Sequence, residues 1–111
     1  MERGSAGGVI ICGLGPIGRE VGRLTAYAPG IAAVVDLDPA AVEAFFEEVK
    51  APAPTFSSLR DALEAAPGAR VFLCTRSSFL EIAPDLRAAA RVGSSVITSC
   101  EEAAWPFARY P

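Results

Sequence analysis

Three glycines follow a short apolar run near the start of the chain, and their spacing restricts the fold more than any other feature. They are Gly13, Gly15 and Gly18. The run before them, Val9–Cys12, is continuous and unbroken by polar residues. Such a run is typical of a strand that is buried on both faces, as in a parallel sheet. The sequence therefore predicts a buried strand, a glycine-rich turn and then a helix.

Each glycine of the turn meets a different steric need. Gly13 allows a tight turn out of the strand, Gly15 lets a pyrophosphate approach the backbone, and Gly18 lets the helix pack closely on the sheet. The N-terminus of that helix offers free N–H groups and a partial positive charge to phosphates. Pro16 fits the first helical turn, where an N–H has no partner within the helix. We therefore interpret the turn, including Pro16 and Ile17, as a phosphate-binding loop.

An acid completes the pattern. Asp36 directly follows a second apolar run, Ile31–Val35, and lies 18 residues beyond Gly18. In dinucleotide-binding folds, an acid about 20 residues past the last glycine binds the hydroxyls of the adenine ribose. The alternative is an ordinary turn aspartate. A carboxylate here repels a 2′-phosphate, which favours NAD, while Arg19 and Arg76 leave NADP as a second cofactor.

Strands and helices alternate along the rest of the chain. We expect strands at Val9–Cys12, Ile31–Val35, Thr55–Phe56, Val71–Thr75 and Ser95–Ser99. We expect helices from the glycine turn to about Tyr27, from Asp38-Pro39 to Ala51, from Ser58 to Ala66, and from near Phe79 to Val92. Ile17, Val21 and Leu24 recur at helical spacing and predict the apolar stripe of the first helix. The alternation predicts one domain, residues 1–111, with a Rossmann-like, doubly wound α/β fold and a mostly parallel sheet of about five strands.

Composition excludes several classes of function. Apolar residues make up 51% of the chain and charged residues 21%, which indicates a globular protein. The net charge of −3 provides no basic face for nucleic acid or an anionic membrane. No apolar run approaches the roughly 20 residues of a membrane span, and the first residues do not form a secretory signal. We therefore expect a cytoplasmic protein without nucleic-acid or membrane partners.

Few residues are suited to acid–base chemistry. The chain has no histidine, and Lys50 is its only lysine. The three cysteines, Cys12, Cys74 and Cys100, have the spacing of neither a disulfide framework nor a zinc site, and we expect them to be small buried hydrophobes. No metal ligands or catalytic residues are therefore predicted.

Polar segments follow the last two expected strands, where a parallel sheet binds its ligands. The candidate contacts to the nicotinamide half are Thr75, Arg76, Ser77, Ser99 and Cys100. Serine and threonine also serve as helix caps, which is the alternative for the first segment. We do not expect Cys100 to be a nucleophile, because Glu101 and Glu102 would raise its pKa.

Four segments together resemble a known family. They are residues 9–18, 35–40, 75–80 and 96–102, and Ser99–Glu102 leading to Trp105-Pro106 is the most specific. In this order they resemble the N-terminal NAD(P)-binding domain of the dihydrodipicolinate reductase-like oxidoreductases, closest to the 2,4-diaminopentanoate dehydrogenases. The resemblance implies hydride transfer between a nicotinamide cofactor and an amino-acid-like or imine substrate.

In that family a second domain binds the substrate and supplies the catalytic groups. The sequence to Pro111 contains no counterpart of it, so we expect a chain that binds the cofactor and is inactive alone. Apolar surface near the last strand would then favour self-association, or association with the missing substrate domain. The alternatives are a stand-alone NAD(H)-binding sensor or scaffold and, less favoured by the dinucleotide spacing, a methyltransferase-like domain.

Overall fold

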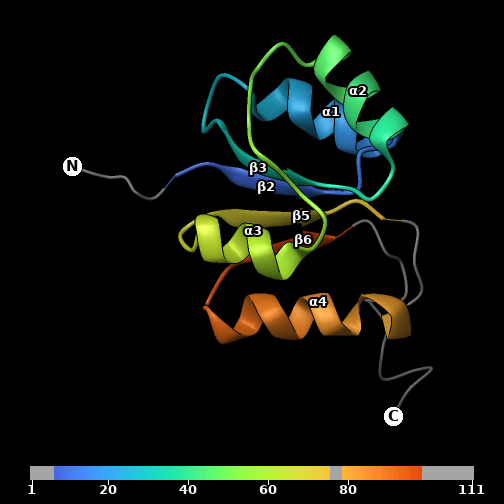
Figure 1. Cartoon of the computed structure of the whole chain (residues 1–111). Coiled ribbons are helices and arrows are strands. Elements are labelled where there is room, and N and C mark those ends of the chain that lie inside the picture. Colours follow the sequence, from blue (N-terminus) through green and yellow to red (C-terminus); the bar gives the residue numbers. More distant parts are fainter. Residues whose placement is uncertain (1–6, 76–78, 99–111) are drawn as a thin grey trace.

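The computed structural model describes residues 7–75 and 79–98, and a parallel sheet lies at its centre (Figure 1). The strands are β2 (Val9–Cys12), β3 (Ile31–Val35), β4 (Thr55–Phe56), β5 (Arg70–Leu73) and β6 (Val96–Thr98). They lie in the order β4-β3-β2-β5-β6, and each adjacent pair is parallel. The predicted Rossmann-like α/β fold is confirmed.

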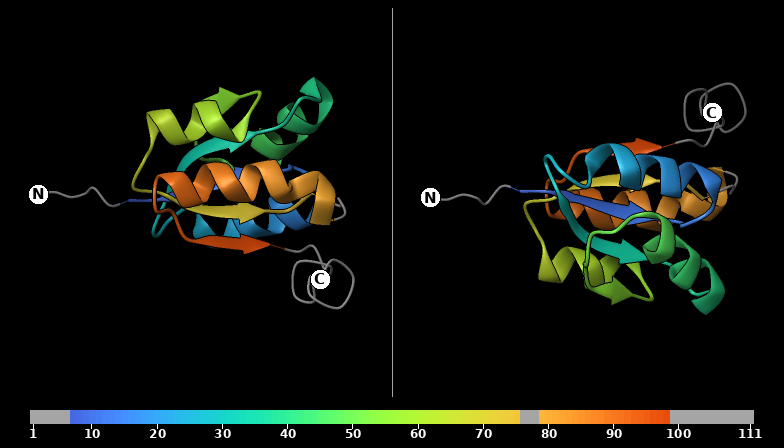
Figure 2. Two further views of the ribbon diagram at one scale, coloured as in Figure 1. Left: turned by 90° about the horizontal axis from the view of Figure 1, so that it is seen from below. Right: turned by 90° about the horizontal axis from the view of Figure 1, so that it is seen from above.

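Helices cover both faces of the sheet. They are α1 (Pro16–Thr25), α2 (Pro39–Glu48), α3 (Leu59–Ala65) and α4 (Phe79–Arg91). Figure 1 shows α1 and α2 on one face and α3 and α4 on the other, and the two views of Figure 2 look onto each pair in turn. None of the helices in the described ranges is long and apolar enough to cross a membrane.

The direction of winding changes between β2 and β5. From β2 the chain builds outward through β3 to β4, and it then returns to place β5 on the other side of β2. Val9 of β2 therefore pairs with both Ile31 and Arg70. In open α/β sheets the crevice at such a switch point, beyond the carboxyl ends of the strands, binds ligands.

The core has one cluster on each face of the sheet, and β2 contributes to both. Ile10 and Cys12 belong to the cluster beneath α3 and α4, whereas Val9 and Ile11 belong to the cluster beneath α1 and α2. All four side chains are buried. This double burial explains why the strand has a continuous apolar sequence instead of alternating polar and apolar residues.

The packing face of α1 differs from the predicted stripe. Ile17 is 49% exposed and Leu24 is 71% exposed, so this part of the prediction is wrong. The buried residues of α1 are Gly18 and Gly22, and a Cβ on Gly22 would lie 2.7 Å from the ring of Phe45 in α2. The helix thus approaches its neighbours through the backbone at these glycines, together with the side chain of Val21, which packs against the core as predicted.

The predicted helix starts at Asp38 and Ser58 are confirmed. The Asp38 carboxylate accepts a hydrogen bond from the N–H of Ala40 at 3.0 Å, and the Ser58 hydroxyl accepts one from the N–H of Asp61 at 3.2 Å. One later boundary differs from expectation, because β5 ends at Leu73, two residues before its predicted end. The predicted last helix is confirmed, since α4 runs from Phe79 to Arg91 and includes Pro84.

Candidate functional site

The first glycine of the turn has a conformation that other residues rarely adopt. Gly13 has a φ of +94°, in the region that favours glycine. A Cβ on Gly13 would lie 3.0 Å from the carbonyl carbon of Cys74 and from Cγ2 of Thr75. Its N–H donates to the carbonyl of Val35 at 2.9 Å. The chain thus leaves β2 through a narrow space between the ends of β3 and β5.

The other two glycines have opposite surroundings. A Cβ on Gly18 would lie 2.0 Å from the carbonyl oxygen of Gly13, so the start of α1 packs directly on the turn. A Cβ on Gly15 would meet no atom of the described residues within 4 Å. One glycine is thus required by the fold itself, whereas the other leaves open space above the turn.

Asp36 joins the glycine turn to the end of β3. One carboxylate oxygen, Oδ2, accepts a hydrogen bond from the N–H of Leu14 at 2.8 Å, and Oδ1 accepts one from the N–H of Asp38 at 2.9 Å. An ionised carboxylate offers about four acceptor positions. Two of these positions therefore remain for hydroxyl donors of a ligand.

Two adjoining hollows meet at Asp36, beyond the carboxyl ends of the strands. The turn hollow, about 390 Å³, lies over the glycine turn and reaches Cys74 and Thr75. The α3–α4 hollow, about 350 Å³, lies on the other side of Asp36 and reaches Ser58 and Asp85. Gly13, Asp36 and Thr75 line both hollows. The two hollows thus form a continuous surface of a size common among small-molecule sites.

Most of the predicted site residues in the described ranges meet at the turn hollow. Its lining includes Gly13, Gly15, Pro16, Ile17, Asp36 and Thr75. Gly18 is buried beneath the turn and supports it without lining the hollow. The predictions for Arg76, Ser77, Ser99 and Cys100 fall outside the described residues.

Sequence reasoning missed the residues of the α3–α4 hollow. The missed residues include Leu37, Ser57, Ser58 and Asp85. Ser58 carries a helix-capping signal, and its place beside the site follows only from the position of β4 in the sheet. Asp85 lies in the helix after β5, and no spacing rule relates it to Asp36.

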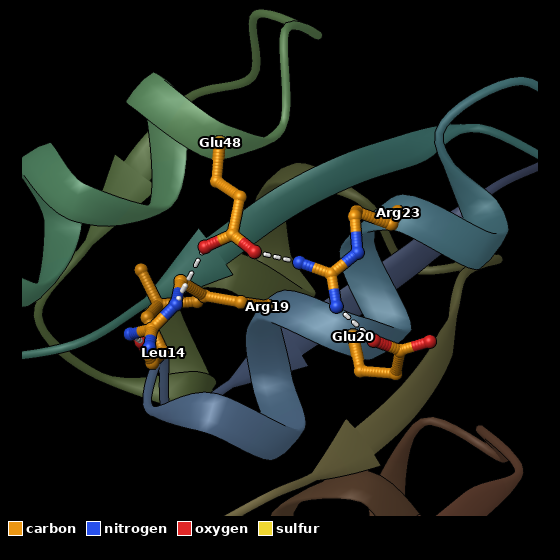
Figure 3. Close-up of polar contacts among 5 residues, drawn as sticks. All are labelled: Leu14, Arg19, Glu20, Arg23 and Glu48. Atoms are coloured by element: carbon orange, nitrogen blue, oxygen red, sulfur yellow. Dashed lines mark hydrogen bonds and ion pairs between the residues drawn. The ribbon is translucent and has the colours of Figure 1, made fainter.

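A group of charged residues joins α1 to α2 behind the turn (Figure 3). The Arg19 side chain lies 2.8 Å from Glu48 Oε1 through Nε and donates from Nη1 to the carbonyl of Leu14 at 3.4 Å. Arg23 forms ion pairs with Glu48 and Glu20. Such exposed pairs contribute at most about 1 kcal/mol to stability. Their main effect is positional, because they hold Arg19 against the turn and Glu48.

Two thiols lie at the carboxyl ends of the central strands. Burial, with smaller contributions from the nearby Asp85, Cys74 and Asp36, raises the pKa of Cys12 to about 12. Burial raises the pKa of Cys74 to about 11. Both thiols are therefore protonated near neutral pH and are poor nucleophiles. This agrees with the prediction that these two cysteines are small hydrophobes.

The raised thiol pKa values predict slow alkylation and a loss of stability in alkali. Iodoacetamide at about pH 8 should leave Cys12 and Cys74 unmodified in the folded protein and modify both in urea. The folded-state pKa lies above the ordinary value of 9.0, so stability should fall as the pH rises above 9.0. Peptide mass mapping and urea titrations across this range measure the two effects. Rapid labelling of folded Cys12 would contradict its burial.

Comparisons with known proteins show likeness at the level of the fold. The sequence matches no protein-family model and no curated protein. The structure resembles apo scyllo-inositol dehydrogenase from Lactobacillus casei, with a TM-score of 0.63 and 19% identity over 84% of this chain. It also resembles that enzyme with bound cofactor NAD(H) and scyllo-inositol, with a TM-score of 0.65 and 20% identity over 85% of this chain.

The chain spans 28% of the length of these dehydrogenase chains. At such low identity the likeness establishes a shared Rossmann-like fold. The solved structures therefore support the Rossmann-like fold that the resemblance to the dihydrodipicolinate reductase-like oxidoreductases implies. They do not support membership of that specific family.

Proposed function

We propose that this chain is an NAD(H)-binding domain of an oxidoreductase. The observation that carries the proposal is the hydrogen bond between Asp36 Oδ2 and the N–H of Leu14. It brings the acid at the end of β3 into direct contact with the glycine turn at the end of β2. The proposed ribose-binding carboxylate and the proposed phosphate-binding turn are thus held next to each other, as binding of one nucleotide requires.

The turn provides a place for a pyrophosphate. Within the described ranges no side chain caps α1, whose N-cap is Gly15. The first N–H groups of a helix have no acceptor within the helix, and together with the helix dipole they favour an anion. The open space at Gly15 lets phosphate oxygens approach these groups. The adenine ribose would then place its hydroxyls on the free acceptor positions of Asp36.

The charges around the site favour NAD(H) over NADP(H). A 2′-phosphate would lie against the carboxylate of Asp36. Arg19, the nearby cation, is already held by Glu48 and the carbonyl of Leu14. Using it for a phosphate would break these contacts.

The reaction class is a finer proposal. The NAD(H)-bound scyllo-inositol dehydrogenase shows that a dehydrogenase can carry a domain of this fold. The resemblance of residues 75–80 and 96–102 to the dihydrodipicolinate reductase-like enzymes supports hydride transfer to or from an amino-acid-like or imine substrate. Because the chain has no histidine and one lysine, we propose that other polypeptide segments supply the acid–base groups.

Titration of the purified chain with NADH, NADPH and S-adenosylmethionine tests the proposal. We expect NADH to bind at least about tenfold more tightly than NADPH, a difference of about 1.4 kcal/mol. S-adenosylmethionine should not bind. Preferential binding of S-adenosylmethionine would overturn the proposal and favour a methyltransferase-like domain.

Gly15→Ala should weaken NADH binding while leaving the fold intact. The new methyl group would occupy the space intended for the pyrophosphate, and we expect an affinity loss of about tenfold or more. The φ of Gly15, −76°, suits alanine, and its Cβ meets no described atom within 4 Å. The urea midpoint should therefore match that of the parent. Unchanged NADH affinity in a folded variant would show that the phosphates do not bind at Gly15.

A further inference from the structure

The α3–α4 hollow contains a second carboxylate besides Asp36. Asp85 reaches it from α4, a helix that covers the sheet face opposite to α1 (Figures 1 and 2). Its side chain is half-buried, and burial raises the pKa of its carboxyl. Cys12, Asp36 and Asp85 line the same hollow, and both carboxylates also raise the pKa of the Cys12 thiol.

The two carboxylates differ in what holds them. Asp36 accepts two backbone hydrogen bonds, which fix its position. For the Asp85 side chain, no hydrogen bond or ion pair is found with the described side chains of residues 7–75 and 82–98. A half-buried carboxylate in this state loses solvation without gaining a partner. A hydrogen-bond donor on a bound molecule would compensate for the lost solvation.

The position of Asp36 restricts what can enter this hollow. If Asp36 binds the ribose hydroxyls and the glycine turn binds the phosphates, the base attached to that ribose must lie in a hollow next to Asp36. The α3–α4 hollow shares Gly13 and Thr75 with the turn hollow. A third hollow next to Asp36, on the α2 side, has neither residue in its lining. The base therefore lies in the α3–α4 hollow, which is continuous with the turn hollow that binds the phosphates.

The lining of this hollow suits a purine. Val35, Leu37 and Leu59 supply apolar surface for a flat ring, and Ser57 and Ser58 supply polar groups at its edge. Asp85 is the carboxylate in this lining other than Asp36. An ionised carboxylate only accepts hydrogen bonds, so it attracts an amino group and repels a carbonyl oxygen at the same position.

We propose that Asp85 is the residue that selects the base, accepting a hydrogen bond from the exocyclic amino group of adenine. This inference rests on the proposed function, because it assumes a dinucleotide in the site. It makes the domain specific for adenine dinucleotides over those whose base carries a carbonyl at that position. Asp36 then selects the sugar and Asp85 selects the base.

Two dinucleotides that differ at position 6 of the purine, and in the proton that N1 carries, test this assignment. Reduced nicotinamide hypoxanthine dinucleotide has a carbonyl oxygen where NADH has the adenine amino group. The parent should bind NADH about tenfold or more tightly than this analogue, since hydrogen bonds to charged groups are among the stronger ones. Equal affinity, or tighter binding of the analogue, would overturn the inference without any variant.

Asp85→Asn should remove the preference for adenine. The asparagine amide has a similar shape and can present either a donor or an acceptor, so the ratio of the two affinities should fall toward one. A merely structural role would lower both affinities equally and leave the ratio unchanged, which would overturn the inference. Glu64→Gln, on the exposed side of α3, is the matched control and should keep the ratio of the parent.

The two levels of proposal can fail separately. If the parent binds neither dinucleotide, both the proposed function and this inference are wrong. If the parent binds NADH but the ratio is the same in Asp85→Asn, only the inference about Asp85 is wrong.

Discussion

Gly18→Ala is expected to lower the free energy of unfolding by about 2 to 3 kcal/mol, the upper part of the range for overpacked sites. The added Cβ would lie 2.0 Å from the carbonyl oxygen of Gly13, a backbone atom at the end of the central strand. Alanine is a better helix former than glycine by about 1 kcal/mol. A loss of stability would therefore be steric in origin, since helix propensity acts in the opposite direction.

Gly15→Ala is the matched control for this experiment. Both glycines belong to the same turn, but a Cβ on Gly15 meets no described atom within 4 Å. Urea titrations followed by circular dichroism should show a lower midpoint for Gly18→Ala and an unchanged one for Gly15→Ala. Equal stability of Gly18→Ala and the parent would contradict the close packing of α1 on the turn.

Asp36→Ala is expected to weaken NADH binding by about tenfold to a hundredfold for each hydrogen bond to the ribose that is lost. Hydrogen bonds to a charged acceptor contribute about 1.5 to 3 kcal/mol each, and the variant loses those to the ribose hydroxyls. It also leaves the N–H groups of Leu14 and Asp38 without their acceptor. The turn then loses its attachment to β3, which adds to the loss of affinity.

Two further variants separate the effect of the Asp36 charge from the helix-capping role of Asp38. Asp36→Asn removes the charge and should raise the affinity for NADPH relative to NADH, because the repulsion of the 2′-phosphate is lost. Asp38→Ala removes the N-cap of α2 and should lower stability by about 1 kcal/mol without changing NADH affinity. Calorimetric titration of all three variants measures the affinities, and a urea titration of Asp38→Ala measures its stability. Parent-like NADH affinity in Asp36→Ala would exclude Asp36 as the ribose-binding acid.

The elements that could be predicted from the sequence are those with local signals. The apolar run at Val9–Cys12 predicts a doubly buried strand, and Asp38 and Ser58 predict helix starts. The spacing of the glycines predicts the turn, because each position has its own steric requirement. In each case neighbouring residues carry the whole signal.

The remaining features depend on contacts that no local pattern contains. Helical periodicity predicts only Val21 of the packing face of α1, because Gly18 and Gly22 bury backbone and have no apolar side chain. The bond from Leu14 to Asp36 joins residues 22 positions apart. Asp85 lines the same hollow as Asp36 because β5 lies on the other side of β2 from β3. This strand order has no local signal in the sequence.

The return of β5 to β2 has a consequence for biosynthesis. The central strand emerges from the ribosome before the other described strands, yet its second partner begins 61 residues later, at Arg70. Closing such a loop costs chain entropy before any contact compensates for it, so pairings of this kind form late. The hollow that reaches Thr75 and Asp85 cannot exist on a shorter nascent chain. A dinucleotide would therefore bind only after the sheet has closed, and would stabilise the finished domain by mass action without guiding its assembly.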